Sequence, residues 1–478
     1  MAGSVASAGG LAGTIPACCF HLFVVFMPLS SRVRFALTGG ALAITAGALA
    51  LPWYGSRMVA VGLQELAAEH STRDFRIRNF SHEAGWLNSS GRLDLEWHDP
   101  CADNAEAPTV VHLEYRARHV PDLKGLSRFD WSAAPAGEGA AGVRALLRGG
   151  KLTGTGHAGF DGTFSTDMQL PELGMVTNGQ NLQVTPSAGR MELGNTSLRF
   201  NWVFERMALR GNGDALEAKQ IALSLDLKNR AVGTGRIALD IDSMSTADLT
   251  LQGLRVSSET TERADRLDSK VTESVRSAQF LGQNLQNLVL EAEVKGLHTA
   301  SVQTVSRVFS ESCGLQNATA DEKQQMRAAV KKLLLAGFSV GIPKLQGSGN
   351  EGGLDGKLVL TLAPAQGEEV LLASQLSSSG HIHIKGQLMP PEQKAFALST
   401  GYVNEVPDGV QAGFEYGGGI LKVSGKTLDG AIVQLGLQKL DGWIKAFLAG
   451  ESLALPEEEL PLVPPSEAPA AAPAAPVS

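Results

Sequence analysis

The residues of this sequence best suited to metal chemistry are two histidines two positions apart, His381 and His383 in the segment "HIHIK". On a β-strand both rings would project from one face, as two metal ligands require. A metal site needs a third and a fourth ligand, and the sequence fixes no Cys, Asp or Glu beside the pair. We therefore favour an exposed polar strand face and assign no metal ligand.

A glycine-rich string, "GTGHAG", places Gly154, Gly156 and Gly159 at the spacing of a dinucleotide-binding fingerprint. That fingerprint works only where a buried strand precedes it and a helix follows, because the helix N-terminus faces the pyrophosphate. Here "FDGTFSTDMQL" follows, and its alternating apolar and polar residues predict another strand. We interpret the string as a hairpin and expect no cofactor.

Two adjacent pairs, His82-Glu83 and His98-Asp99, would suit acid–base chemistry if their side chains met. Neighbouring residues of a strand point to opposite faces, so neither pair forms a dyad. The chain also lacks a "GxSxG" nucleophile elbow. We therefore assign no catalytic residue.

Composition narrows the class of protein and its partners. The 54 glycines and the low share of charged residues, 19%, favour strands and turns. A net charge of −8 without a basic block argues against a nucleic-acid partner, whose binding depends on clustered Lys and Arg. Cys101 and Cys313 are the only cysteines in the body of the chain, and they form either one long-range disulfide or two buried thiols.

An apolar segment near the N-terminus, residues 35–51, would span about 26 Å as a helix, close to the thickness of a bilayer core. Arg32 and Arg34 precede it and Trp53 follows, so we expect a transmembrane anchor with residues 1–34 in the cytoplasm and the body outside it. The main alternative is a signal peptide cleaved after Ala50. A buried core helix is disfavoured because the segment has no polar face.

The first 26 residues carry almost no charge, and Met27 begins a more conventional basic start. We expect that residues 1–26 are not native to the product. A real second apolar segment over 15–29, forming a hairpin with the first, is the alternative.

Beyond a short amphipathic helix at 56–70, period-two alternation bounded by Gly, Pro, Asn and Asp predicts half-buried antiparallel strands. Helical patterns interrupt it at 299–312, 321–335 and 391–399, and a last hairpin turns at 417–419. The predicted fold is α+β, mainly antiparallel β: one N-terminal transmembrane helix, then an extended curved antiparallel sheet with a few packed helices. We place a β-rich domain, outside the cytoplasm, at 56–455 and a disordered Pro/Ala-rich tail at 456–478.

Several of these segments resemble the YdgA-like bacterial envelope proteins, a family of uncharacterised function. The similarity lies in Trp53-Tyr54-Gly55, in "FRIRNFSHEAGWLNSSGRLDLEW", in the helix at 321–335 and in "FEYGGGILKVSGKTLDG", and it covers residues 32 to about 440. The chain departs from the family at His119-Val120-Pro121, where relatives tend to have His-Gly-Pro. The resemblance implies an inner-membrane anchor with a periplasmic β-rich body and supplies no catalytic residue.

Three functions fit these expectations. We favour a non-enzymatic binding or scaffold protein whose sheet holds an envelope lipid or protein. An envelope hydrolase would need His119, Asp161 and the His381–His383 pair to meet in one pocket. A structural subunit would self-associate into a homo-oligomer through its sheet edges.

Overall fold

The computed structural model describes residues 75–85, 87–98, 107–119, 125, 127–159, 161, 163–177, 179–211, 214–230, 232–280, 283–312, 315, 317–428 and 430–451. Within this part of the chain, 62% of the residues lie in strands and 19% in helices. The strands belong to one 22-stranded sheet, and every pairing between them is antiparallel.

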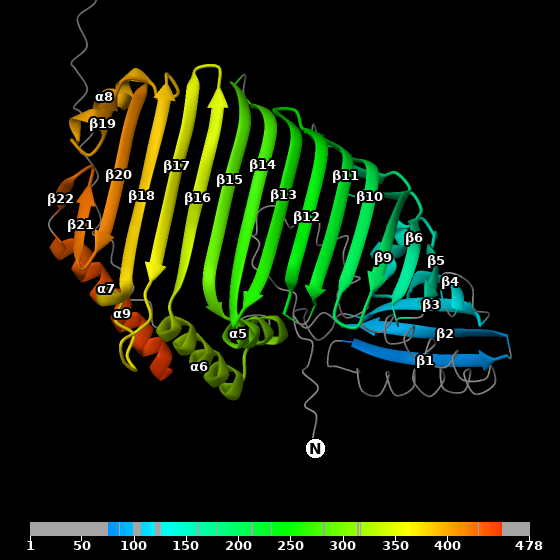
Figure 1. Ribbon diagram of the computed structural model, residues 1–478. Coiled ribbons are helices and arrows are strands. Elements are labelled where there is room, and N and C mark those ends of the chain that lie inside the picture. Colours follow the sequence, from blue (N-terminus) through cyan, green and yellow to red (C-terminus); the bar gives the residue numbers. More distant parts are fainter. Residues whose placement is uncertain are drawn as a thin grey trace, which may run out of the picture.

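Most of the sheet is a meander, in which each strand pairs with the next along the chain (Figure 1). Its first part contains β1 (Phe75–Ala84), β2 (Asn88–Trp97), β3 (Thr109–Arg118), β4 (Ser127–Ala136), β5 (Leu152–Ala158), β6 (Phe164–Leu170), β7 (Leu173–Thr177), β8 (Gln180–Val184), β9 (Ser187–Leu193), β10 (Leu198–Gly211) and β11 (Asp214–Asn229). Its second part contains β12 (Thr234–Ser245), β13 (Leu249–Arg263), β14 (Arg266–Phe280), β15 (Gln283–His298), β16 (Phe338–Gly349), β17 (Gly352–Leu362), β18 (Leu376–Gly386), β19 (Asn404–Val406), β20 (Gly409–Gly417), β21 (Ile420–Val423) and β22 (Lys426–Leu428).

The register of these strands carries one row of facing residues across the sheet. Because directly opposed residues share a face, this row defines what we call the inner face. From β2 to β20 the row contains Gly91, Tyr115, Trp131, Gly154, Met168, Gly189, Trp202, Leu223, Leu239, Val256, Glu273, Leu290, Leu345, Gly356, Ile382 and Ala412. The opposite side is the outer face.

At its N-terminal end the sheet curls around its inner face and encloses a core. Residues of β2 and β3 pack there with residues of β9, β10 and β11, and Leu95 and Leu227 are almost fully buried. Figure 1 shows the same curl as a turn in strand direction, since β1 lies across the direction of β12.

Large aromatic side chains in this core lie over glycines of the neighbouring strand. A Cβ added at Gly189 would lie 2.1 Å from Cε3 of Trp202, and one at Gly154 would lie 2.5 Å from Cε2 of Trp131. Both indoles donate their N–H, to Ser187 Oγ at 3.0 Å and to Thr166 Oγ1 at 2.9 Å, respectively. These positions need glycine because the indoles occupy the space a side chain would take.

A crease crosses the long strands. Gln220, Gly253 and Asn287 adopt left-handed φ angles of 50°, 63° and 52° and lie in an interrupted part of the ladder. Apolar residues on the two sides of the crease are three positions apart, as with Ala218 and Ile221, which lie in one cluster. The alternation therefore changes phase at the crease, and apolar residues of β10, β11 and β12 on both sides of it lie on the same face.

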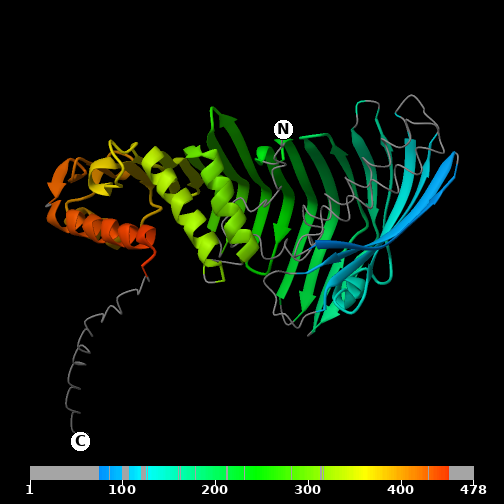
Figure 2. The same cartoon turned by 90° about the horizontal axis from the view of Figure 1, so that it is seen from below.

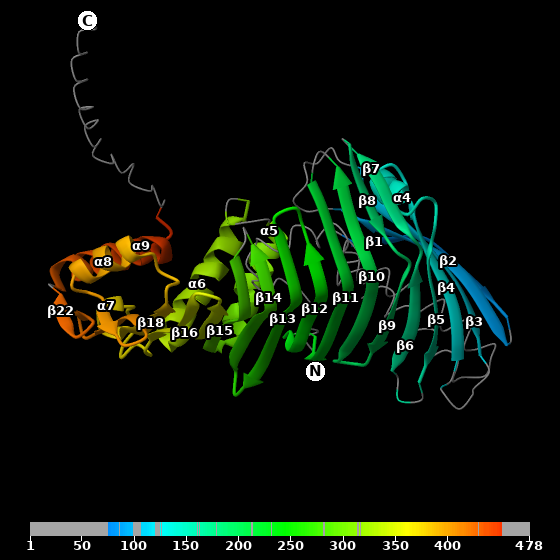
Figure 3. The ribbon, with the colours of Figure 1, turned by 90° about the horizontal axis from the view of Figure 1, so that it is seen from above.

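Helices lie mainly at the ends of the strands and cover little of the sheet (Figures 2 and 3). They are α4 (Ala141–Leu146), α5 (Thr299–Ser312), α6 (Ala320–Ala336), α7 (Leu372–Gln375), α8 (Pro391–Ser399) and α9 (Gly430–Ala449). Thr319 and Glu322 form a capping box at the start of α6. At its end, Arg266 donates to the carbonyl oxygens of Ala336 and Gly337 and ties the helix to β14.

The predicted helices at 299–312, 321–335 and 391–399 are present, as is the hairpin that turns after Gly417. The predicted fold class, α+β with a transmembrane helix, is wrong, because the described chain is mostly one antiparallel sheet. In the described residues no helix is long and apolar enough to cross a bilayer; α9 contains Lys439, Asp441 and Lys445. The predicted anchor at 35–51, the helix at 56–70 and the tail at 456–478 lie outside the described residues.

Candidate functional site

The inner face of β12–β18 carries a mostly apolar surface, which we call the apolar stripe. Its members are aliphatic side chains that the register and alternation place on that face. They are Ile237, Leu239, Ile241, Leu254, Val256, Val271, Val275, Leu288, Leu290, Val294, Val340, Ile342, Leu345, Leu354, Leu358, Leu360, Ile382 and Ile384. At a strand spacing of about 4.8 Å, the stripe extends over about 29 Å along the sheet.

Much of the stripe is only half-buried, unlike the closed core beside it. Val340, Leu358, Leu360 and Ile382 are exposed to 41%, 38%, 36% and 40%. A sheet face made of aliphatic residues is normally covered, because leaving it in water forgoes the hydrophobic gain of burial. The stripe therefore has the character of a binding surface.

The two ends of the stripe differ. On one side it joins the core enclosed by β1–β11 through Leu223 and Ile237, which pack against that core. On the other side, α6, α7 and α9 cover the ends of β16–β20 that lie lowest in Figure 1. Leu362 and Tyr416 are buried there together with Leu437 of α9. The open surface lies between these two packed regions.

The outer face of the same strands is charged, so the two faces have opposite character. Lys270 and Glu291 lie 2.7 Å apart across β14 and β15. Lys385 and Asp355 lie 3.1 Å apart across β17 and β18. Ion pairs of this kind contribute little to stability but keep this face in water.

One carboxylate interrupts the stripe. Glu273 lies opposite Val256 and Leu290 in the register and between Val271 and Val275 along β14. It is half-buried, and no described residue forms an ion pair or hydrogen bond with its side chain. Among the described members of the central row from β12 to β18 it is the single formal charge.

The histidine pair of β18 lies on the outer face, away from the stripe. His381 and His383 do share a face, since they oppose Gly413 and Gln411 of β20. His383 lies 3.1 Å from Asp408 Oδ1 and 3.4 Å from Asp355 Oδ2. In the described residues no group of His, Cys, Asp and Glu is arranged to hold a metal ion.

His119 lies in the closed core, far from those histidines. Its Nε2 is 2.8 Å from Ser89 Oγ, and both residues are buried. Burial, with a smaller effect from His82, lowers the pKa of His119. His82 in turn lies 2.7 Å from the hydroxyl of Tyr115, whose pKa is raised by burial. Burial therefore keeps the Ser89 and His119 side chains from direct contact with solvent.

The residues of the hydrolase alternative do not meet. Asp161 accepts hydrogen bonds from Thr163 in an exposed turn, and these bonds lower its pKa. His119 directly follows β3, and His383 lies in β18. These strands are thirteen strand steps apart, about 60 Å along the sheet at normal strand spacing, and they lie at opposite ends of it (Figure 1). No single pocket can hold them.

The remaining candidates are structural or lie outside the described residues. Gly154 and Gly156 lie in β5, which pairs with β6 as the predicted hairpin. His82 and Glu83 are neighbours in β1 and point to opposite faces. Asp99, Cys101, Cys313 and Val120-Pro121 are outside the described part of the chain.

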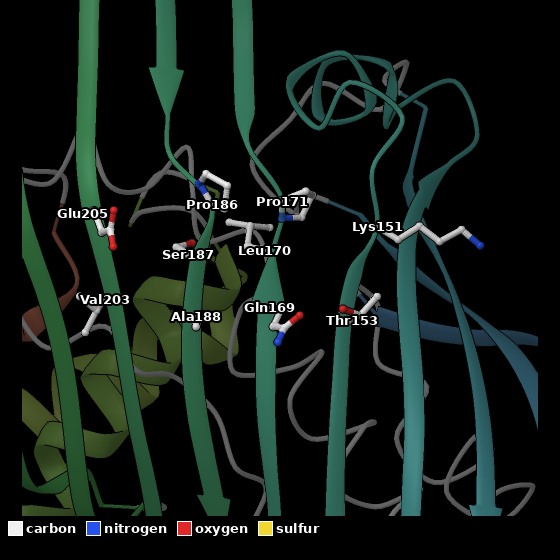
Figure 4. Close-up of a pocket in the computed structure, with 10 residues that line it drawn as sticks. All are labelled: Lys151, Thr153, Gln169, Leu170, Pro171, Pro186, Ser187, Ala188, Val203 and Glu205. Atoms are coloured by element: carbon white, nitrogen blue, oxygen red, sulfur yellow. The ribbon is translucent and has the colours of Figure 1, made fainter.

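A shallow depression lies on the outer face of β5, β6, β9 and β10 (Figure 4). Thr153, Gln169, Ala188 and Val203 form a row across its floor, and Lys151 lies at its edge. Lys151 is 3.7 Å from Glu114. The lining combines small, polar and single apolar residues without converging catalytic groups, so it is a weaker candidate than the stripe.

The stripe was only partly predictable. Alternation indicated half-buried strands, but their order across the sheet and the change of phase at the crease depend on pairing. Helix α9 was missed, although Leu437, Asp441, Ile444 and Leu448 follow helical spacing.

Fold and surface together define a protein with one very wide antiparallel sheet, curled into a core at one end and open over an apolar face at the other. A family model described as a bacterial protein of unknown function (DUF945) matches residues 35–388, and the chain belongs to this family. The match ends just after β18, so it includes the whole stripe. Searches of curated proteins and of solved structures found no match.

Proposed function

We propose that this protein binds the acyl chain of an envelope lipid on the apolar stripe, without catalysing a reaction. The observation that carries this proposal is the partial exposure of Val340, Leu358, Leu360 and Ile382 on a face that is mostly aliphatic. A flexible hydrocarbon chain matches a surface that is long and mostly aliphatic. A protein partner would gain specificity from polar groups that the stripe does not offer.

Self-assembly through the sheet edges has less support. At the C-terminal end of the sheet, the edge strands β19 and β22 are only three residues long. At the N-terminal end, the edge strand β7 is five residues long, and β1 carries Arg76 and Arg78 and has a register shift between Arg78 and Ser81. Short, charged and bulged edges disfavour pairing with another sheet.

We further propose that the chain is a YdgA-like member of its family and that residues 56–455 lie in the periplasm of a bacterium. The segments quoted above from Trp53 onward support this assignment. Protease accessibility in spheroplasts, combined with mass analysis of the mature N-terminus, tests the placement. Protection of the body in intact spheroplasts would contradict it.

The binding proposal is tested by extracting lipid from the purified full chain and identifying it by mass spectrometry. Leu360 and Val359 are neighbours on β17, half-exposed on the inner face and half-buried on the outer face, respectively. Leu360→Glu should remove the copurifying lipid, and Val359→Glu should retain it. Equal lipid content in the two variants would overturn the proposal.

A further inference from the structure

Helix α9 packs against the sheet end with one side only. Leu437 is buried, and Ile444 packs beside it against Leu362 and Tyr416. On the same side, Asp441 accepts a hydrogen bond at 2.9 Å from the backbone N–H of Leu372 at the start of α7. These contacts fix which side of the helix faces the protein.

Part of the helix surface that faces water is also apolar. Leu435, Leu440 and Trp443 are exposed to 56%, 44% and 46%. With 3.6 residues per turn, these side chains and Phe447 form an arc that runs from the flank of the helix to the side opposite Leu437. A helix that is apolar on both sides is normally covered on both sides.

The charges of α9 restrict what can cover this arc. Lys439 is exposed near its centre, between Leu435 and Trp443 in the helical projection. Lys445 lies at the polar flank, 4.0 Å from Glu369, and Asp441 faces the protein. The arc therefore carries one cation and no anion.

We propose that this arc of α9 docks the C-terminal end of the sheet onto an anionic lipid surface. An interfacial helix combines exposed aliphatic and Trp side chains with Lys, whose stem lies along the apolar region while its ammonium reaches the headgroups. A symmetric contact with a second copy is less suitable, because it would bring Lys439 against its own equivalent in an apolar interface.

The position of α9 in the fold agrees with this role. The helix covers the lower end of the strands that form the stripe and lies at the outer end of the molecule (Figure 2). Docking there would bring the stripe close to a membrane. The inference rests on residues separate from the stripe, so each proposal can fail alone.

The test replaces Trp443 with the photoreactive residue p-benzoylphenylalanine in the full chain and illuminates it with vesicles of phosphatidylethanolamine and phosphatidylglycerol. We expect lipid adducts on the peptide that contains position 443. The same residue in place of Phe396 is the matched control, since Phe396 is 73% exposed on α8 at the opposite end of β20 (Figure 1). A crosslinked dimer, a crosslink to residues 1–74, or equal lipid labelling at both positions would overturn the proposal.

A charge reversal gives a second readout. Lys439→Glu should reduce the lipid adduct at position 443 several-fold with phosphatidylglycerol present and should change it little with phosphatidylcholine alone. Lys439 is exposed, so the variant keeps its fold. If the adduct yield depends neither on Lys439 nor on the charge of the lipid, docking on anionic lipid is contradicted.

Discussion

Removing two exposed side chains of the stripe should weaken acyl-chain binding by an amount that follows from their exposure. Leu358 and Ile382 are diagonal neighbours on β17 and β18, with exposed fractions of 38% and 40%. Complete burial of such a side chain is worth about 1.5–3 kcal/mol. A ligand that covers both exposed parts would therefore gain about 1.2–2.3 kcal/mol from the pair.

The double variant Leu358→Ser with Ile382→Ser should lose that gain. The expected result is a dissociation constant about 7- to 45-fold weaker. The assay is a titration of the full chain with a fatty acid that carries an environment-sensitive fluorophore. Because the buried parts of the two side chains also contribute to folding, the variant should be less stable by about 2–4 kcal/mol, and the titration is run well below its melting temperature.

The matched control is Val203→Ser. Val203 is 45% exposed, but it lies on the outer face of β10. This change should destabilise the fold without weakening the binding of the fluorescent fatty acid. If Val203→Ser weakens binding as much as the double variant does, or if the double variant binds normally, the reasoning from the stripe is refuted.

Other consequences of the structure can be measured separately. Glu273→Leu should strengthen acyl-chain binding about 5-fold by removing an unpaired half-buried carboxylate, whereas Glu259→Leu on the outer face should leave binding unchanged. Equal dissociation constants for the two variants would contradict this expectation. The lowered pKa of His119 means that its neutral form stabilises the fold above about pH 6.5 and that this stability falls as the pH drops below that value. Urea unfolding at several pH values should show this loss of stability, and the loss should be smaller in His119→Gln. If the free energy of unfolding depends on pH equally in both proteins, His119 is not its source. Gly189→Ala should lower the free energy of unfolding by about 1–3 kcal/mol because the Trp202 indole fills the space. Gly442→Ala, in an open helical position, should raise it by up to about 1 kcal/mol. If thermal melts show Gly442→Ala to be the less stable variant, the described packing is wrong.

The secondary structure was largely readable from residue periodicity. The helix at 321–335 has a capping box and a continuous apolar spacing, both local features of the chain. The strands of the meander likewise show period-two alternation that survives in the fold. Local patterns predict such elements because each depends on nearby residues only.

The candidate site was predictable only as a general property. The alternation of β13 changes phase at Gly253, so Leu251 and Leu254 are three positions apart, and sequence alone does not explain this spacing. The stripe arises when neighbouring strands change phase at the same level, which is a property of pairing. Leu358 is exposed because α6, α7 and α9 cover only one end of the neighbouring strands. Periodicity along the chain does not specify how far such helices cover a sheet.

The proposed acyl chain lies on the inner face of β12–β18. The most direct measurement is photolabelling of the full chain with a diazirine-bearing fatty acid, followed by mapping of the labelled residues by mass spectrometry. The predicted result is saturable labelling at Val340, Leu358, Leu360 and Ile382, competed by unlabelled fatty acid. Labelling confined to outer-face residues such as Lys357 and Val359, or labelling that does not saturate, would contradict it.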